Sequence, residues 1–492
     1  MSMFNSLNIA KSGLFASQKA IELTGHNIAN ANTEGYTRQR LEMSSKPSLS
    51  FQGSSPGGGV SLDDITQVRD KYIDVQLRKE NSVAKELEYK ASGFEFIEGI
   101  IAEPTDYGIN AAMSDLFNSM EELSYNAEDL TLREIVVQNA VKLTDTFKSV
   151  SNGLVDYQRD LNSDLTMVVE EINSIGEQIQ NYNQTIRDYE NRGKQANDLR
   201  DKRNLLVDQL SDIVPVDAKE DSDGRFSVKV GGVYLVDQYK FNPMEVKLGE
   251  SDNPYTSQPD NEVFWSDSEK EVSVRSGRLK GLLDLRDGNT EDNQGVAYYI
   301  QKLDNLAQAI TEKFNEEHVK GYTLPTDGSE SQDGIEFFKS YDSDSTKEVT
   351  ARNMSVSDAL ISTGFNIAAS DSKITGDMNW GNNGNLVELV KLRDKDSLSI
   401  DDRDGNEIQI GNLEQYLRST VSDLAITTDY YNNRSESQKT LTDHIENQKM
   451  SISEVSTDEE MMNLVQYQHS YSAAAKLVTV VDEMLMTLIN MR

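Results

Sequence analysis

The chain of 492 residues contains no cysteine, and this absence removes several kinds of site at once. Without thiols there are no disulfides, no thiolate metal ligands and no cysteine nucleophile. A chain of this length without a thiol also suits a protein that works outside the reducing cytosol and needs no covalent cross-links.

Basic residues are also scarce, with 48 lysines and arginines against 83 acidic residues and a formal net charge of −35. Nucleic-acid binding depends on basic side chains that displace phosphate counterions, so we expect no nucleic-acid partner. A net charge of this size favours solubility and says nothing about the fold.

Long apolar runs are missing as well. The N-terminal stretch MSMFNSLNIAKSGLFASQ has neither a basic region nor a continuous apolar core of the kind found in cleaved signal peptides. The most apolar late stretch, 473–491, is interrupted by Lys476, Asp482 and Glu483. We therefore expect no membrane insertion, and export, if it occurs, without a cleaved signal.

Signatures of catalysis are absent too. The glycine-rich stretch 53–60 is followed by no Gly-Lys-Ser/Thr, which favours a flexible connector. In 402–407, Glu407 occupies the place of the sharp-turn glycine of a calcium loop, so a turn is expected. The histidines form no paired-ligand spacing: they are His26, His318, His444 and His469. We predict no enzyme, no cofactor and no metal.

Both ends of the chain carry apolar stripes with alternating steps of four and three residues, which is typical of coiled-coil seams. Thr457 and Glu460 have capping-box spacing, which predicts that the C-terminal helix starts there. The N-terminal seam is Met3, Leu7, Ala10, Leu14, Ser17, Ile21, Thr24 and Ile28. The C-terminal seam is Leu464, Tyr467, Tyr471, Ala474, Val478, Val481, Leu485 and Leu488.

The two end segments have opposite charge, with a net +2 for residues 1–60 and −4 for residues 451–492. Each stripe alone is explained by packing on a core of the same molecule. Together, the opposite charges favour pairing of the two helices. Small residues on both seams limit the buried surface, so we infer that the ends are mobile in the monomer and become ordered with neighbouring copies of this or related chains.

The middle of the chain predicts a helical rod with β-rich insertions. Residues 161–189 carry an unbroken seam about 42 Å long, and 132–147, 199–210, 297–319 and roughly 412–450 are also expected to be helical. Residues 215–276 alternate apolar and polar side chains around Asp-Gly and Gly-Gly turns, which indicates hairpins. Residues 321–400 are rich in Asp, Ser, Asn and Gly, which indicates an inserted surface domain.

The expected fold is therefore mainly α, an elongated rod of several domains with β-rich insertions and terminal helices paired as a coiled coil. Its helical-bundle middle is discontinuous in sequence. The expected division is a terminal coiled-coil domain (1–60 and 452–492), a helical rod (61–214, 277–320 and 401–451), a hairpin part (215–276) and an outer surface domain (321–400).

One stretch near the N-terminus, HNIANANTEGYTRQ, is unusually specific. Its asparagines, Asn27, Asn30 and Asn32, favour a helix end because their side chains bond to nearby backbone. Gly35 allows the positive φ of a tight reversal. By these rules alone an ordinary helix stop explains the stretch equally well.

This stretch resembles the Asn-x-x-Asn-x-x-Thr-Pro-Gly-Tyr motif of the family of flagellar rod, hook and hook-associated proteins. Thr-Arg-Gln after Gly-Tyr is most similar to the members that form the first junction between hook and filament. Residues 197–211, 276–287 and the closing helix, with Tyr467 and Tyr471, are similar to the same members. The chain departs from the family at Glu34, where proline is usual, and at Glu454, where glycine is usual.

The resemblance implies a structural protein of the bacterial flagellum that assembles as a ring on the distal end of the hook and connects it to the filament. The implied partners are other copies of the chain, hook protein, the second hook-associated junction protein, and an export chaperone on about 455–492. Type III export without a cleaved signal and an extracellular location are also implied.

We expect the assembly interface to be formed by both terminal helices and the motif. Its expected residues are Leu7, Leu14, Ile21, Ile28, Asn30, Asn32, Gly35, Tyr36, Arg38, Tyr467, Tyr471, Val478, Val481, Leu485 and Leu488. The alternatives are another axial protein (hook, distal rod or second junction protein) and, from a different class, an enzyme within 321–400.

Overall fold

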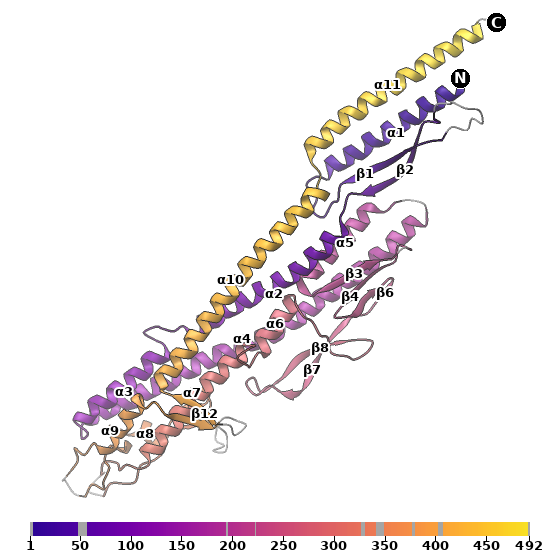
Figure 1. Ribbon diagram of the computed structural model, residues 1–492. Coiled ribbons are helices and arrows are strands. Elements are labelled where there is room, and N and C mark those ends of the chain that lie inside the picture. The colour runs from indigo at the N-terminus through magenta and orange to yellow at the C-terminus, as the bar shows by residue number, and fades with distance from the viewer. Residues whose placement is uncertain are drawn as a thin grey trace.

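The computed structural model describes residues 3–47, 57–192, 195–221, 223–325, 330–340, 349–375, 379–401 and 407–490. Over these residues the protein is an elongated rod with both chain ends at the same tip (Figure 1). Helices dominate, and small antiparallel sheets lie along one side and at the far end, as the expected mainly α fold requires.

The body of the rod is a bundle of long helices. Its members are α2 (Lys71–Ile101), α3 (Ile109–Tyr125), α4 (Leu130–Glu190), α5 (Asn197–Ile213), α6 (Arg278–Asp287), α7 (Val296–His318) and α10 (Leu413–Ser453). The helices expected at 199–210, 297–319 and 412–450 are confirmed as α5, α7 and α10. The sequence pattern did not single out α2 and α3.

Helix α4 joins two segments that the sequence analysis treated as separate helices, 132–147 and 161–189. It runs for 61 residues from an N-cap at Asp129, whose side chain accepts from the backbone N–H groups of Thr131 and Leu132. Gly153 does not interrupt it, because a Cβ there would lie 2.9 Å from Ile100 and the glycine permits close packing against α2. Tertiary packing therefore overrides the low helix propensity of glycine.

The hairpins expected in 215–276 are confirmed and pack on α4. One sheet has the order β3 (Val216–Glu220), β4 (Phe226–Val230), β5 (Val233–Asp237) and β6 (Lys240–Phe241), and a second pairs β7 (Met244–Asp252) with β8 (Pro259–Trp265). Gly231 and Gly232 turn the chain between β4 and β5 with φ of +58° and +86°. Because Gly176 of α4 has no side chain, the Phe241 ring packs against it. A Cβ built on Gly176 would lie 2.6 Å from that ring.

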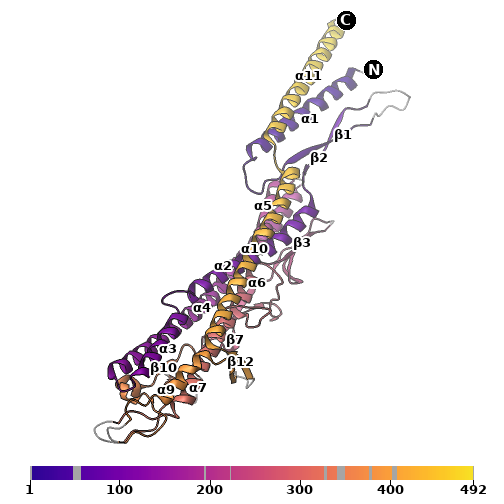
Figure 2. The same cartoon turned by 60° about the vertical axis from the view of Figure 1, so that its left-hand side comes forward.

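The described part of 321–400 lies at the end of the rod farthest from the termini (Figure 2). It contains β9 (Phe338–Ser340), β10 (Met354–Val356), α8 (Asp358–Ser362), η1 (Gly364–Asn366), α9 (Gly384–Lys391), η2 (Leu392–Asp394) and β11 (Leu398–Asp401), which pairs with β12 (Glu407–Gly411). The turn expected at 402–406 lies outside the described residues. Phe337 and Leu386 share one core with Phe117 and Phe314 of the bundle, so the segment is packed on the helices.

Arg133 of α4 fastens this segment to the bundle. The side chain is 1% exposed and donates to the backbone carbonyls of Ala127, Gly364 and Ile367. Burial lowers the pKa of Arg133 to about 10. No sequence periodicity indicated this contact, because its partners are up to 234 residues away.

His318 also holds the far segment and gives it a pH dependence. Its ring is fully buried, and Nε2 accepts from the backbone N–H of Ala368 at 2.9 Å while Nδ1 lies against the carbonyl oxygen of Ile335. Nε2 accepts a hydrogen bond, so the ring is neutral with its proton on Nδ1. Burial lowers the pKa of His318 to about 4.

We expect the free energy of unfolding of this segment to fall on acidification. The unfolded His318 has a pKa near 6.5, so stability is complete above that pH and is lost as the pH falls toward 4. The loss is on the order of 3 kcal/mol over this window. Thermal unfolding at a series of pH values measures it, and His318→Gln should flatten the dependence; an unchanged slope in that variant would assign it to other groups.

The terminal part of the molecule consists of α1 (Met3–Ala29), α11 (Thr457–Asn490) and an antiparallel hairpin of β1 (Gln39–Ser45) and β2 (Val60–Gln67) (Figure 1). The sequence analysis did not anticipate the hairpin. Of the connector expected at 53–60, residues 53–56 lie outside the described residues, and residues 57–59 lead into β2. The N–H of Lys46, just after β1, donates to the Gly59 carbonyl.

The expected start of the C-terminal helix at Thr457 is confirmed, but its expected cap is wrong. The Ser456 hydroxyl accepts from the Glu459 N–H, and Glu460 bonds elsewhere. Among the described helices, none combines the length and hydropathy that a bilayer span requires.

Candidate assembly interface

Helices α1 and α11 pack closely because small side chains separate them. A Cβ built on Gly13 of α1 would lie 3.9 Å from the Cβ of Ala474 on α11. The buried residues of α1 in its described side chains are small or polar: Ala10, Ala16, Ser17, Ala20, Thr24 and Asn27. This pairing of the two ends is the geometry that the opposite charges and the two seams indicated.

The larger seam residues lie at the margin of this contact in the single chain. On α1, Leu7, Leu14, Ile21 and Ile28 are half-buried. On α11, Val481 is buried at 2% exposure, Tyr467, Val478 and Leu485 are half-buried, and Tyr471 is 37% exposed. The side chain of Leu488 lies outside the described residues.

A second stripe on α11 is left largely exposed by the described residues of the single chain. Leu477, Val480 and Met484 are 45%, 50% and 43% exposed, and with Ala473 they repeat in steps of four, three and four. Such steps keep side chains on one face of a helix. Val480 directly precedes the buried Val481, so this second face is distinct from the one that contacts α1.

Asn27 joins the end of α1 to the motif loop and to α11. It is 1% exposed. Its Nδ2 donates to the Gln39 carbonyl at 2.9 Å and to Glu460 Oε2 at 3.1 Å. Its Oδ1 accepts from the Tyr36 hydroxyl at 2.8 Å and the Gln39 N–H at 3.1 Å. The amide is therefore fully satisfied by three residues from two segments, the motif stretch and α11.

Arg38 adds a charged clamp beside this amide. Its guanidinium donates to Glu460 Oε1 and to Glu459 Oε2, each at 2.9 Å. Its backbone N–H donates to the Ser453 carbonyl, the last residue of α10. Glu460 is 3% exposed, so this ion pair is largely shielded from solvent. The motif loop thus holds the break between α10 and α11.

The same loop is fixed to the start of α5. Asp201 Oδ1 accepts from the Thr37 hydroxyl and the Gln67 amide, both at 2.7 Å, and Oδ2 accepts from the Thr37 N–H at 3.1 Å. Gln39 Nε2 donates to Asp198 at 2.9 Å. Burial raises the pKa of Asp201 to about 6. Residues 27–39 and 197–201, which the sequence marked separately, therefore meet in one polar node.

The other motif residues have smaller roles in the single chain. Asn30 is half-buried and donates to the His26 carbonyl, and Asn32 is exposed. Tyr36 contacts His26 Nδ1 at 3.0 Å, and burial raises the pKa of its phenol. The sequence reasoning placed weight on Asn30 and Asn32 and missed Asn27, Asp201 and Glu460 as contact residues.

Gly35 adopts a conformation that other residues rarely take, with φ of +75°, and a Cβ there would lie 3.2 Å from Leu205. Gly35→Ala should therefore lower the free energy of unfolding by about 1–2 kcal/mol. The matched control is Gly25→Ala in α1, where no atom lies within 4 Å; it should raise stability by roughly 0.5–1 kcal/mol. Thermal unfolding compares the two, and equal effects would contradict the role of the left-handed turn.

A buried charge cluster ties the node to the rod below it. Arg69 pairs with Asp74, and Arg78 Nε lies 2.6 Å from Asp208. Lys449 near the end of α10 lies 3.1 Å from the same Asp208. Because these ion pairs are mostly shielded, removing one partner would leave an uncompensated buried charge. The described residues contain no cluster of three or more metal-ligating side chains.

Three family models match the chain. The one described as flagellar hook-associated protein FlgK helical domain matches residues 94–338. Those described as flagella basal body rod protein and flagellar basal body rod FlgEFG protein C-terminal match residues 7–37 and 446–491. The first of these two matches covers most of α1 and the motif as far as Thr37, and the second covers α11.

Relatives match over almost the whole chain. Flagellar hook-associated protein 1 of Bacillus subtilis is 29% identical over 99% of this chain and 98% of its own length. The protein of the same name from Salmonella typhimurium is 24% identical over 100% of this chain and 100% of its own length. The solved structure of the flagellar hook junction protein FlgK from Burkholderia pseudomallei has a similar fold, with a TM-score of 0.60 and 14% identity over 77% of this chain and 100% of that chain.

Proposed function

We infer that this chain, which belongs to the flagellar hook-associated protein 1 family, is a structural protein of the bacterial flagellum that connects the hook to the filament. It acts by assembly within the flagellar axis. The match of the helical-domain model to 94–338 favours this role over that of a hook or rod protein, which is the remaining alternative.

The proposed mechanism rests on one observation. Helices α1 and α11 are paired in the single chain, and the second apolar stripe of α11 remains exposed. Leu477, Val480 and Met484 face solvent in one chain, although an apolar stripe of this kind gains about 25 cal/mol per Å² when it is removed from water. We propose that α1 and α11 of neighbouring copies bury this stripe and the half-buried Leu7, Leu14 and Ile21 in the inner tube. The motif node then fixes the direction of each rod relative to that tube.

The proposed partners are further copies of the chain, hook protein on one side and the second hook-associated junction protein on the other. Before assembly, an export chaperone is proposed to cover α11, whose exposed Met461, Met462 and Val465 extend its apolar surface. We further propose type III export to the cell exterior without a cleaved signal. The far segment, 321–400, is proposed to face outward.

Deleting the gene tests the function directly. Electron microscopy of the cells should show hooks without filaments, and flagellin should appear in the medium as monomer. Loss of the hooks themselves would move the protein to the rod or hook. Normal filaments would refute the junction role.

A further inference from the structure

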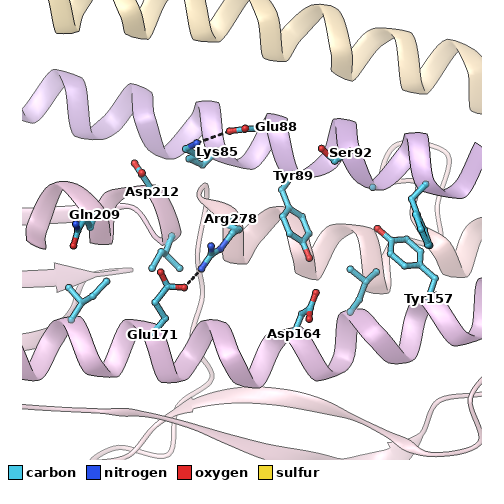
Figure 3. Close-up of a pocket in the computed structure, with 15 residues that line it drawn as sticks. Lys85, Glu88, Tyr89, Ser92, Tyr157, Asp164, Glu171, Gln209, Asp212 and Arg278 are labelled. Carbon is cyan, nitrogen blue, oxygen red and sulfur yellow. Dashed lines mark hydrogen bonds and ion pairs between the residues drawn. The ribbon is translucent and has the colours of Figure 1, made fainter.

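A groove with a volume of about 840 Å³ runs along the rod between α2 and α4, with Gln209 and Asp212 of α5 at one end (Figure 3). Its apolar lining combines the aromatic Tyr89, Phe96 and Tyr157 with aliphatic residues of α4 and α5, and Phe96 is 54% exposed. The rings of Phe96 and Tyr157 contact each other at a tilt of 46°, with ring centroids 4.5 Å apart. The groove follows α4 from Tyr157 to Ile175, about 27 Å at 1.5 Å per residue.

The polar groups of the groove are incompletely satisfied. Arg278 Nε and Asp212 Oδ1 are buried atoms without a hydrogen-bond partner among the described residues. Two ion pairs, Lys85 with Glu88 and Arg278 with Glu171, use the bases that line the groove. Asp164 and Asp212 form no ion pair with the described residues, so the groove lining has four acids against two bases. Buried polar atoms without partners call for an explanation.

Helix α10 carries a stripe with complementary chemistry, which we call the α10 ridge. Its residues follow steps of three and four: Ile426, Tyr430, Arg434, Ser437, Leu441 and His444. Ile426, Tyr430 and Leu441 are 69%, 54% and 43% exposed. The ridge contains no carboxylate, and Arg434 makes no ion pair with the described residues, although acidic residues outnumber basic ones in this chain. From Ile426 to His444 it also spans about 27 Å.

The groove and the ridge lie at the same height on the rod but on different sides of α2. Asn432 of α10 donates to Glu95 of α2, and the Phe94 and Tyr431 rings are stacked at 5.1 Å. Figure 3 shows α10 along one side of α2 and the groove along the other. A molecule therefore cannot fill its own groove with its own ridge. A neighbour at equal height can do so.

We propose that the groove between α2 and α4 binds the α10 ridge of a neighbouring copy, which makes the rod domains a second, lateral contact of the assembly. This proposal rests on the junction function. Helices α4 and α10 run in the same direction (Figure 1), so centring the ridge on the groove places Arg434 opposite Asp164. Such a contact joins two different surfaces at one height, and its repetition by rotation closes a ring.

The absence of cysteine makes a disulfide test clean. In the register that places Arg434 opposite Asp164, Ser437 lies level with Lys85 of the groove, because Phe96 contacts Tyr157 and α2 runs antiparallel to α4. Lys85→Cys with Ser437→Cys should therefore form cross-linked oligomers in oxidised, purified flagella. The matched control combines Ser437→Cys with Ser163→Cys, an exposed position of α4 that does not line the groove. Equal cross-linking of both pairs would refute the proposal.

Charge variants give a second readout. Arg434→Glu in the cross-linking pair should lower the yield by about tenfold, and Asp164→Lys in the same chain should restore part of it. Lys439→Glu, an exposed position of α10 outside the ridge, should leave the yield unchanged. If the cells carry filaments but the groove pair never cross-links, the lateral contact is refuted and the junction function stands. If the unmodified chain is absent from the junction, the function itself is refuted.

Discussion

Asn27→Ala is expected to release the terminal helices from the rod. The substitution leaves the Gln39 N–H, the Gln39 carbonyl, the Tyr36 hydroxyl and Glu460 without the partner they share. Leaving buried polar groups unsatisfied costs about 1–3 kcal/mol for each group, so we expect the docked state to lose at least about 3 kcal/mol. Alanine is the better helix former, so the loss cannot come from helix propensity.

Amide hydrogen exchange measures this release. In Asn27→Ala, the amides of α1 and α11 should lose protection while those of α4, which the rod core buries, keep it. The matched control is Asn32→Ala, because Asn32 belongs to the same motif but is exposed. If both variants exchanged alike, Asn27 would not hold the node. The comparison requires protected ends in the isolated wild type, as the docked helices lead us to expect, and full protection there would refute the mobility inferred from the small seam residues.

The sequence predicted many elements of the rod because their signals are local. The positions of α5, α7 and α10 follow from apolar periodicity, with Pro215 just after the end of α5. The start of α11 was predicted at the right residue although the cap is Ser456 and not Thr457. The hairpins after Pro215 follow from Gly-Gly and Asp-Gly turns. Where glycine lies inside a long helix, as at Gly153, local rules suggest a break that packing against Ile100 prevents.

The node was beyond local rules because its partners are distant in the chain. Asn27 and Glu460 are 433 residues apart, and Thr37 and Asp201 are 164 apart. The resemblance to a family marked the motif and residues 197–211 but gave no sign that they touch. Glu460 was read as a capping residue, and spacing alone cannot distinguish a cap from a contact to another segment.

The contact within one chain buries only part of the α1 seam that the sequence predicted. Ala10, Ser17 and Thr24 of that seam are buried, whereas its large residues Leu7, Leu14 and Ile21 are half-buried. In the structure α1 lies between α11 and the β1–β2 hairpin, where Ser12 Oγ accepts from the Val60 N–H. Two neighbours bury the small residues between them, which leaves the large ones at the margin.

Aspartate substitutions at two adjacent residues of α11, Val480 and Val481, should separate assembly from folding. Val481 is 2% exposed against α1, whereas Val480 is 50% exposed on the second stripe. Val480→Asp is expected to leave the isolated protein as stable and as protected in amide exchange as the wild type, and to abolish filament formation. Val481→Asp should lose protection along α1 and α11 in the isolated protein, because it places an unpaired charge in the helix contact.

This pair separates contacts within a chain from contacts between chains. Electron microscopy of cells that carry each variant counts hooks and filaments, and amide exchange of the purified proteins reports on folding. Filaments in Val480→Asp cells would show that the second stripe stays exposed in the junction, and the inner tube would then need another surface. A Val480→Asp protein that unfolds at its ends would place Val480 in the intramolecular pair. Only a folded protein without filaments assigns the stripe to a neighbouring copy, since a charge at a buried seam between copies has no solvent to stabilise it.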